Sequence, residues 1–113
     1  MSADPRPPVL NELIHHPTRL AVMAFLSGCA EAEFRAVREG CAMSESALSK
    51  VVARLEAASY IHVRKGYVGK RARTWLRLST EGREALTGHL AALQEIAAGA
   101  AALGASMETA VGD

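Results

Sequence analysis

Positively charged side chains gather in one short stretch of this 113-residue sequence. The segment KGYVGKRART, residues 65–74, contains four cations and no carboxylate, although the formal net charge of the chain is only +1. From Lys50 to Arg77 there are eight cations and one carboxylate, whereas the rest of the chain carries five cations and eleven carboxylates. Such segregation is typical of a surface that binds a polyanion. An ordinary solvated face is the simpler alternative.

The other reactive side chains form no catalytic or metal-binding pattern in the sequence. His15 and His16 are adjacent, so on a helix their side chains diverge and cannot readily share one metal ion. The sequence contains no CxxC, HExxH, GxSxG or phosphate-cradling glycine motif. We therefore expect no catalytic residue, no bound metal and no cofactor, and we interpret the histidines as satisfied or solvated side chains.

Apolar periodicity predicts that some of the cations lie on a helix over residues 44–59, with Ser44 as its N-cap. Apolar side chains at the i, i+3, i+4 and i+7 positions form its buried face: Leu48, Val51, Val52 and Leu55. Small and cationic side chains form the opposite face: Ser46, Ser49, Lys50, Ala53 and Arg54. The exposed face is therefore slim and carries hydrogen-bond donors.

The hydrophobic period changes to two at Tyr60. Residues 60–65 and 74–79 alternate between apolar and polar side chains, which predicts two strands. The basic segment joins these strands, and Gly66 and Gly69 stand where its backbone must turn. We therefore expect a β-hairpin with a long basic loop at its tip.

The segments before this unit are predicted to be helical after a proline-rich start. Residues 1–8 contain three prolines, so we expect a flexible arm. Three short helices are predicted: 9–14, 18–27 and 31–39. Pro17 suits the first turn of the second helix, and Gly28 marks its end.

A final helix is predicted after the hairpin, with Ser79 or Thr80 as its cap, through about residue 98. Residues 99–113 are expected to be partly helical and then frayed. The chain thus contains one domain, over residues 9–98, between the arm and the tail.

Two short helices in succession followed by a charged hairpin predict a winged helix-turn-helix, a mainly α fold with a two- or three-stranded β wing. A recognition helix in the major groove needs small residues near the base edges and donors for bases and phosphates. We therefore expect double-stranded DNA as a partner. The predicted contacts are Ser44, Ser46, Ser49, Lys50, Arg54, Lys65, Lys70, Arg71 and Arg73.

The runs HPTRLAVMAFL and EFRAVREGCAMSESALSKVVARLEAASYIHVRKGYVGKRARTWLRLSTEGREAL resemble winged-helix regulators of the MarR type, in their small single-domain branch. The resemblance extends from residue 14 to about residue 93 and places Gly69, Lys70, Arg71 and Arg73 on the wing. It implies a sequence-specific transcriptional regulator, a repressor that a small molecule releases. One position departs: the pattern prefers Gly where this chain has Ser59, so we expect a less sharp turn into the first strand.

The resemblance also implies a homodimer on a pseudo-palindromic operator, with recognition helices about 34 Å apart. Two apolar stripes are expected to form that interface: Val9, Leu10, Leu13, Ile14, Leu86, Leu90, Leu93 and Ile96. The alternative is that both stripes pack inside one monomer. By analogy, an effector pocket would involve Leu13, His16, Tyr67, Trp75 and His89.

Two other functions remain open from the sequence. An ArsR-like sensor shares this architecture, and Cys41 lies just before the recognition helix, where its oxidation would displace that helix. The second is a winged helix whose basic face binds an acidic protein partner. Cys29 and Cys41 are too few for a secreted disulfide scaffold, and without a signal peptide or a run of 18 apolar residues we expect a cytoplasmic protein that has no membrane partner.

Overall fold

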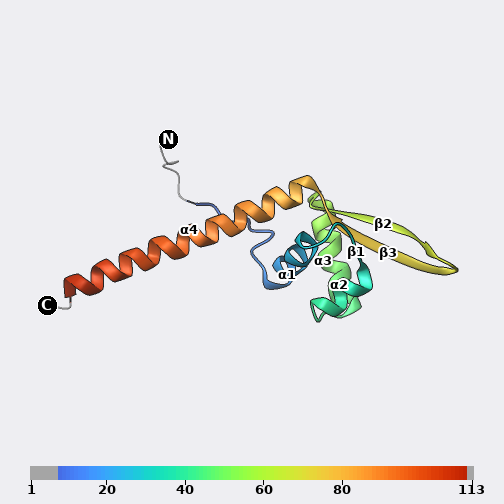
Figure 1. Ribbon diagram of the computed structural model, residues 1–113, viewed down its shortest axis with the longest axis horizontal. Coiled ribbons are helices and arrows are strands. Elements are labelled where there is room, and N and C mark those ends of the chain that lie inside the picture. The colour runs from blue at the N-terminus through green and yellow to red at the C-terminus, as the bar shows by residue number, and fades with distance from the viewer. Residues whose placement is uncertain (1–7, 112–113) are drawn as a thin grey trace.

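The computed structural model describes residues 8–111, with side chains described through residue 108. The elements in chain order are α1 (Pro17–Ser27), β1 (Ala32–Glu33), α2 (Phe34–Gly40), α3 (Glu45–Ala57), β2 (Ile61–Val68), β3 (Arg71–Leu78) and α4 (Thr80–Val111). α4 and the β2–β3 hairpin project in opposite directions from a small helical body (Figure 1), so the molecule measures 72 × 31 × 20 Å. The predicted winged helix-turn-helix is confirmed. Of the arm expected over residues 1–8, only Pro8 lies within the described residues.

The wing is a three-stranded antiparallel sheet in the order β1-β3-β2. β1 pairs Ala32 with Leu76 and Glu33 with Trp75. The helix expected over 31–39 therefore begins only at Phe34, because its first residues extend to complete the edge of the sheet. That pairing was not visible in the sequence, where two glutamates suit the first turn of a helix equally well.

The prediction of a long basic loop at the hairpin tip is wrong, because most of that segment is strand. β2 and β3 stay paired as far as Val68 and Arg71, and only two residues connect them. Gly69 makes this turn with a φ of +64°, a conformation that glycine adopts without strain. Gly66 lies within β2, where an added Cβ would come 3.2 Å from the Trp75 ring. The wing protrudes from the core, so its outer half lacks the apolar alternation that marks a strand.

The core lies between α1, α2, α3 and the inner face of the sheet. Its largest fully buried side chains are Ile14, Met23, Leu26, Leu48, Leu55, Ile61 and Leu76. The four residues predicted for the buried face of α3 are all buried, which confirms that helix. Pro17 stands in the first turn of α1 as predicted.

The short helix predicted over residues 9–14 does not form. The Asn11 side chain replaces it, because its Oδ1 accepts hydrogen bonds from the backbone N–H groups of Leu13 and Ile14, at 3.0 and 3.1 Å. This local turn competes with a helix. It delivers Ile14 into the core, where the side chain is fully buried.

Two helices end in a left-handed residue that is not glycine. Ser59 follows α3 with a φ of +64°, and Ala42 follows α2 with a φ of +53°. After α3, Ser59 N–H bonds to Glu56 and Tyr60 N–H bonds to Leu55, which is the Schellman pattern. The expectation of a less sharp turn at Ser59 is therefore wrong, since serine adopts the conformation that glycine would.

α4 begins at its Ser79 cap, whose Oγ accepts from the Gly82 N–H at 2.9 Å, and continues to Val111. The expected end near residue 98 is thus wrong, because alanines sustain the helix through its glycines. Residues 94–108 are exposed. The segment Thr80–Glu108 is long and apolar enough to cross a membrane by length and composition alone, with only 6% of its most apolar window buried.

Candidate nucleic-acid interface

The recognition helix α3 presents the predicted donors on its exposed face. Ser44 caps it as expected, since its Oγ accepts a hydrogen bond from the Ala47 N–H at 3.1 Å. Ser46, Lys50 and Arg54 follow one another at four-residue spacing and are all exposed. No ion pair occupies Lys50 or Arg54 among the residues that the structure describes. This edge of α3 is free to donate to a polyanion.

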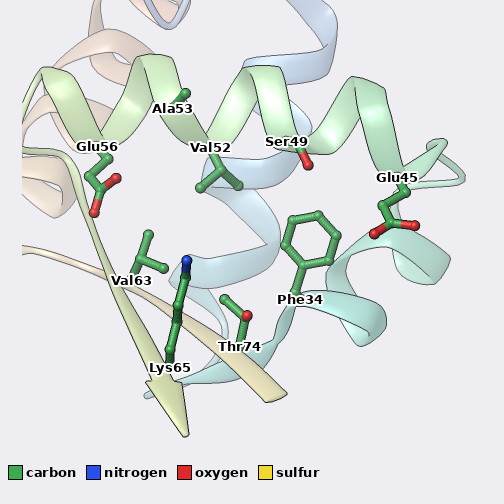
Figure 2. A pocket seen from close by; sticks show the side chains of 9 residues that line it. All are labelled: Phe34, Glu45, Ser49, Val52, Ala53, Glu56, Val63, Lys65 and Thr74. Atoms are coloured by element: carbon green, nitrogen blue, oxygen red, sulfur yellow. The ribbon is translucent and has the colours of Figure 1, made fainter. Parts of the chain in front are cut away.

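The other edge of α3 faces the wing across a groove of about 370 Å³. Its apolar lining comes from Phe34, Val52 and Val63, and Figure 2 shows Ser49 pointing into it. Lys65 reaches toward the groove from β2, so a predicted wing cation and a predicted helix contact border the same hollow. The helix and the wing therefore form one continuous surface.

Two carboxylates in this groove were missed by the sequence analysis. Glu45 and Glu56 line it together with Ser49 and Val52, at spacings of three and four residues along α3. That spacing was the available signal, because residues three and four apart share a helix face. The exposed face of α3 is thus divided into a cationic edge and an edge that carries carboxylates.

The tip of the wing carries cations without partners. Lys70 and Arg71 are exposed, and within residues 8–108 no ion pair involves either of them or Lys65. Tyr67 and Val68 beside them are 75% and 57% exposed, which is high for apolar side chains. The tip therefore offers positive charge together with apolar surface.

Nearer the body, two wing arginines are paired with carboxylates of the chain. Arg73 Nε lies 3.3 Å from Glu33 Oε1, an ion pair whose orientation gives no hydrogen bond, so this buried nitrogen has no hydrogen-bond partner. Arg73, one of the predicted contacts, is thus half-buried and electrostatically compensated.

Arg64 is held more firmly still. Its Nη2 and Nε donate to the two oxygens of Glu31 at 2.7 and 3.2 Å, and its guanidinium lies 4.1 Å from the centre of the Trp75 ring. The hydrogen bonds that Arg64 donates to Glu31 lower the pKa of Glu31 and raise the pKa of Arg64. Both groups stay charged, and their charges cancel at the base of the wing.

The predicted effector residues do not line one pocket. Leu13 and His89 border a cavity of about 540 Å³ between the N-terminal segment and α4. His16 caps α1 instead, since its Nδ1 accepts from the Thr18 N–H at 3.3 Å. Tyr67 lies at the wing tip and Trp75 stacks on Arg64, on the hairpin that points away from α4 (Figure 1).

The predicted dimerisation residues also divide. Ile14 and Leu86 belong to the core, with 0% and 4% exposure, so they are unavailable to a partner. Val9, Leu90 and Ile96 are 79%, 42% and 43% exposed. The two others, Leu10 and Leu93, are half-buried, as is Leu13. The alternative of packing inside the monomer is correct for part of each stripe.

The described residues give little support to a metal or thiol sensor. Among them no three His, Cys, Asp or Glu side chains come together as a metal site. Both cysteines are free thiols, and partial burial raises the pKa of Cys41. A thiol that stays protonated is a poor nucleophile toward oxidants.

A capped recognition helix, a helix-turn-helix and a charged hairpin together define a winged-helix DNA-binding protein. Residues 18–97 match the family described as "Winged helix DNA-binding domain". The chain belongs to that family. A comparison with curated protein sequences returns no significant match.

Solved structures of transcriptional regulators share the fold. A transcriptional regulator homologue from Pyrococcus horikoshii OT3 is 22% identical, with a TM-score of 0.73 over 79% of this chain and 88% of its own. PcaV from Streptomyces coelicolor, solved with its natural ligand, is 24% identical, with a TM-score of 0.67 over 90% and 71%. A MarR family regulator from Silicibacter pomeroyi is 18% identical, with a TM-score of 0.56 over 86% and 73%. The resemblance to the MarR type is confirmed at the level of fold.

Proposed function

We propose that the protein is a sequence-specific transcriptional regulator, a repressor that binds double-stranded DNA as a homodimer. The observation that carries this proposal is the set of unpaired cations that α3 and the wing both present. Lys50 and Arg54 on α3 and Lys65, Lys70 and Arg71 on the wing have no partners of their own within the described residues, and the groove of Ser49 and Lys65 joins the two elements. Unpaired cations attract phosphates at long range.

The recognition helix α3 and the wing would contact different parts of the DNA. α3 lies in the major groove, where Ser46, Ser49 and Lys50 reach base edges and Arg54 reaches a phosphate. The Ser44 end of α3 adds backbone N–H groups for another phosphate. The wing tip lies along the neighbouring backbone or minor groove, with Lys70 and Arg71 as its main contacts.

The homodimer is supported by the surface of α4. Leu90, Ile96, Leu103 and Met107 are 42 to 61% exposed on a helix that extends far beyond the body. Such a helix is unfavourable in water without a cover, and a second copy provides an equivalent apolar helix by two-fold symmetry. Sedimentation equilibrium tests this assignment directly: we expect a dimer, and a monomer at micromolar concentration would contradict it.

An effector is the remaining part of the proposal. The cavity beside Leu13 and His89 lies where the N-terminal segment meets α4, so a small molecule there would change how α4 sits on the DNA-binding part. A cytoplasmic location follows from the proposed role.

A salt titration on selected duplexes tests the central claim. With about 6 to 10 phosphate contacts per dimer, affinity should fall by roughly 10³ to 10⁵ between about 50 and 200 mM salt. Binding sites would be selected from a random duplex pool, which also supplies the operator. Lys50→Ala should change the preferred sequence by about 1 to 3 kcal/mol, whereas equal loss on specific and random duplexes would make Lys50 a phosphate contact. A protein-binding winged helix would show no duplex affinity to titrate.

A further inference from the structure

His89 is a buried histidine whose protonation state the structure defines. It lies on α4 with 1% of its surface exposed. The backbone N–H of Asn11 donates to His89 Nδ1 at 3.0 Å, so Nδ1 carries no proton. In the neutral ring the proton is therefore on Nε2, which faces His15 Nδ1 at 3.4 Å. The two rings meet edge to face, 5.2 Å apart.

Asn11 extends this polar connection from α4 to the end of the recognition helix. Its Nδ2 donates to the hydroxyl of Tyr60 at 2.8 Å. Tyr60 lies three residues after Ala57, the end of α3, and its N–H bonds to Leu55 O at 2.9 Å in the last turn of that helix. Through Asn11, one set of hydrogen bonds thus links α4, the N-terminal segment and the carboxyl end of α3.

A proton on His89 Nδ1 would break this set at the hydrogen bond from Asn11. A protonated ring has N–H groups on both nitrogens, so Nδ1 would confront the Asn11 N–H instead of accepting from it. Burial lowers the pKa of His89, the charge of His15 lowers it further, and the charge of Glu12 acts in the opposite direction. Because the folded pKa lies below the unfolded value, the stability that the neutral ring contributes is complete at higher pH and is lost as pH falls below about 6.5.

We propose that neutral His89 is a positioning residue that holds α4 and the N-terminal segment against the end of the recognition helix, and that protonating it in mildly acidic solution weakens DNA binding. This inference rests on the proposed function. Without the Asn11 connection, α4 loses one of the contacts that hold it against the end of α3, and in a dimer α4 sets how the two recognition helices meet successive major grooves.

The groups around His89 allow this response. From the N-terminal segment, His15 and Glu12 are the titratable groups whose charges act on the His89 ring. Tyr60, after α3, is connected to His89 through Asn11, whose Nδ2 donates to the Tyr60 hydroxyl. From α4 itself, Glu84 lines the adjoining cavity, so two carboxylates border the space that the ring adjoins. The charge of Glu12 eases protonation without replacing the hydrogen bond that the Asn11 N–H loses.

The direction in which DNA affinity changes in acid distinguishes a positioning role for His89 from direct attraction between a charged histidine and DNA. His62 is exposed on the wing, and a positive charge added to that surface would strengthen binding to phosphates. A DNA affinity that falls in acid therefore requires a histidine that acts on positioning rather than on contact.

The experiment compares DNA affinity at about pH 7.5 and pH 5.5 for the full chain and for His89→Gln, whose amide can accept from Asn11 and donate to His15 without titrating. We expect the wild type to lose affinity in acid, by at most about tenfold per pH unit, and His89→Gln to lose much less. His62→Gln is the matched control: it keeps His89, so it should lose at least as much affinity in acid as the wild type. Equal acid losses for wild type and His89→Gln would overturn the proposal.

A second readout keeps the test independent of DNA. Hydrogen exchange at the Asn11 amide should accelerate in acid relative to its intrinsic rate in the wild type and not in His89→Gln, and unchanged protection would overturn the proposal. If His89→Gln does not fold, Tyr60→Phe replaces it: without its hydroxyl, affinity at pH 7.5 should fall and the acid response shrink. No duplex binding at any pH, together with normal His89-dependent exchange, would instead contradict the proposed function.

Discussion

The tip and the base of the wing both carry cations, but only those at the base have partners within the described chain. At the base, Arg64 and Arg73 are paired with Glu31 and Glu33, carboxylates from the segment that leads into and forms β1. At the tip, Arg71 and its neighbouring lysines project from the hairpin and have no such partners within the described residues. Cations that are satisfied within the chain build the structure, whereas unsatisfied cations are available to a ligand. Charge counted along a sequence does not separate the two.

The largest effect is expected at the base, where the backbone itself is tightly packed. A Cβ on Gly82 would lie 2.1 Å from the carbonyl oxygen of Tyr60, so Gly82→Ala must displace either the start of α4 or the start of β2. We expect the free energy of unfolding to fall by about 2 to 4 kcal/mol, as measured by urea denaturation. The control is Gly88→Ala on the same helix, where the added Cβ meets nothing within 4 Å, and whose stability should rise by up to about 1 kcal/mol. Similar losses in both variants would show that the packing at Gly82 is not decisive.

The next effect separates the two kinds of arginine on one strand. Arg71 and Arg73 lie two residues apart on the same face of β3, so they form a natural pair for substitution. Arg71→Ala should weaken binding to specific and random duplexes alike, by about tenfold or roughly 1.4 kcal/mol, and reduce the salt slope by about one. Arg73→Ala should cost less than about threefold, because Glu33 already compensates its charge. A larger loss for Arg73→Ala in fluorescence anisotropy titrations would break the distinction between tip and base.

These contrasts also show how far the sequence could be read. The α3 helix, its Ser44 cap and the turn at Gly69 were predictable because local spacing and turn chemistry determine them. The pairing of Arg73 with Glu33 was not, since it joins residues that are distant in sequence and meet only when β1 completes the sheet. The same holds for Asn11 and His89, whose contact also replaced the helix expected at the N-terminus. Local patterns thus located the interface, and long-range contacts decided which of its charges are free.

A smaller effect is expected on the free energy of unfolding, at Ser59 near the base of the wing, with no change in duplex affinity. Ser59 adopts a left-handed conformation that costs a side chain about 1 to 2 kcal/mol, against about 0.5 to 1 kcal/mol of extra backbone entropy for glycine. Ser59→Gly should therefore raise the free energy of unfolding by roughly 0.5 to 1 kcal/mol and leave duplex affinity unchanged. Ser46→Gly, inside α3, serves as the opposite control and should destabilise the helix. Destabilisation of both variants would indicate that the Ser59 side chain contributes more than its conformation costs.

The smallest effect is expected when Arg73, at the base of the wing, loses its carboxylate partner and becomes unpaired like Arg71 at the tip. This change is also the most direct test of the comparison. Glu33→Gln removes the carboxylate beside Arg73 while it keeps the shape of the side chain, so a half-buried cation on the same face of β3 as Arg71 is left without its partner. We expect duplex affinity to rise by about two- to threefold, since a partly exposed ion pair contributes less than about 1 kcal/mol. Glu31→Gln is the matched variant: Arg64 would remain stacked on Trp75, 4.1 Å from the ring centre, and its freed charge should add less. If Glu31→Gln gave the larger gain in parallel titrations, Arg64 rather than Arg73 would be the base arginine that lies nearer to DNA.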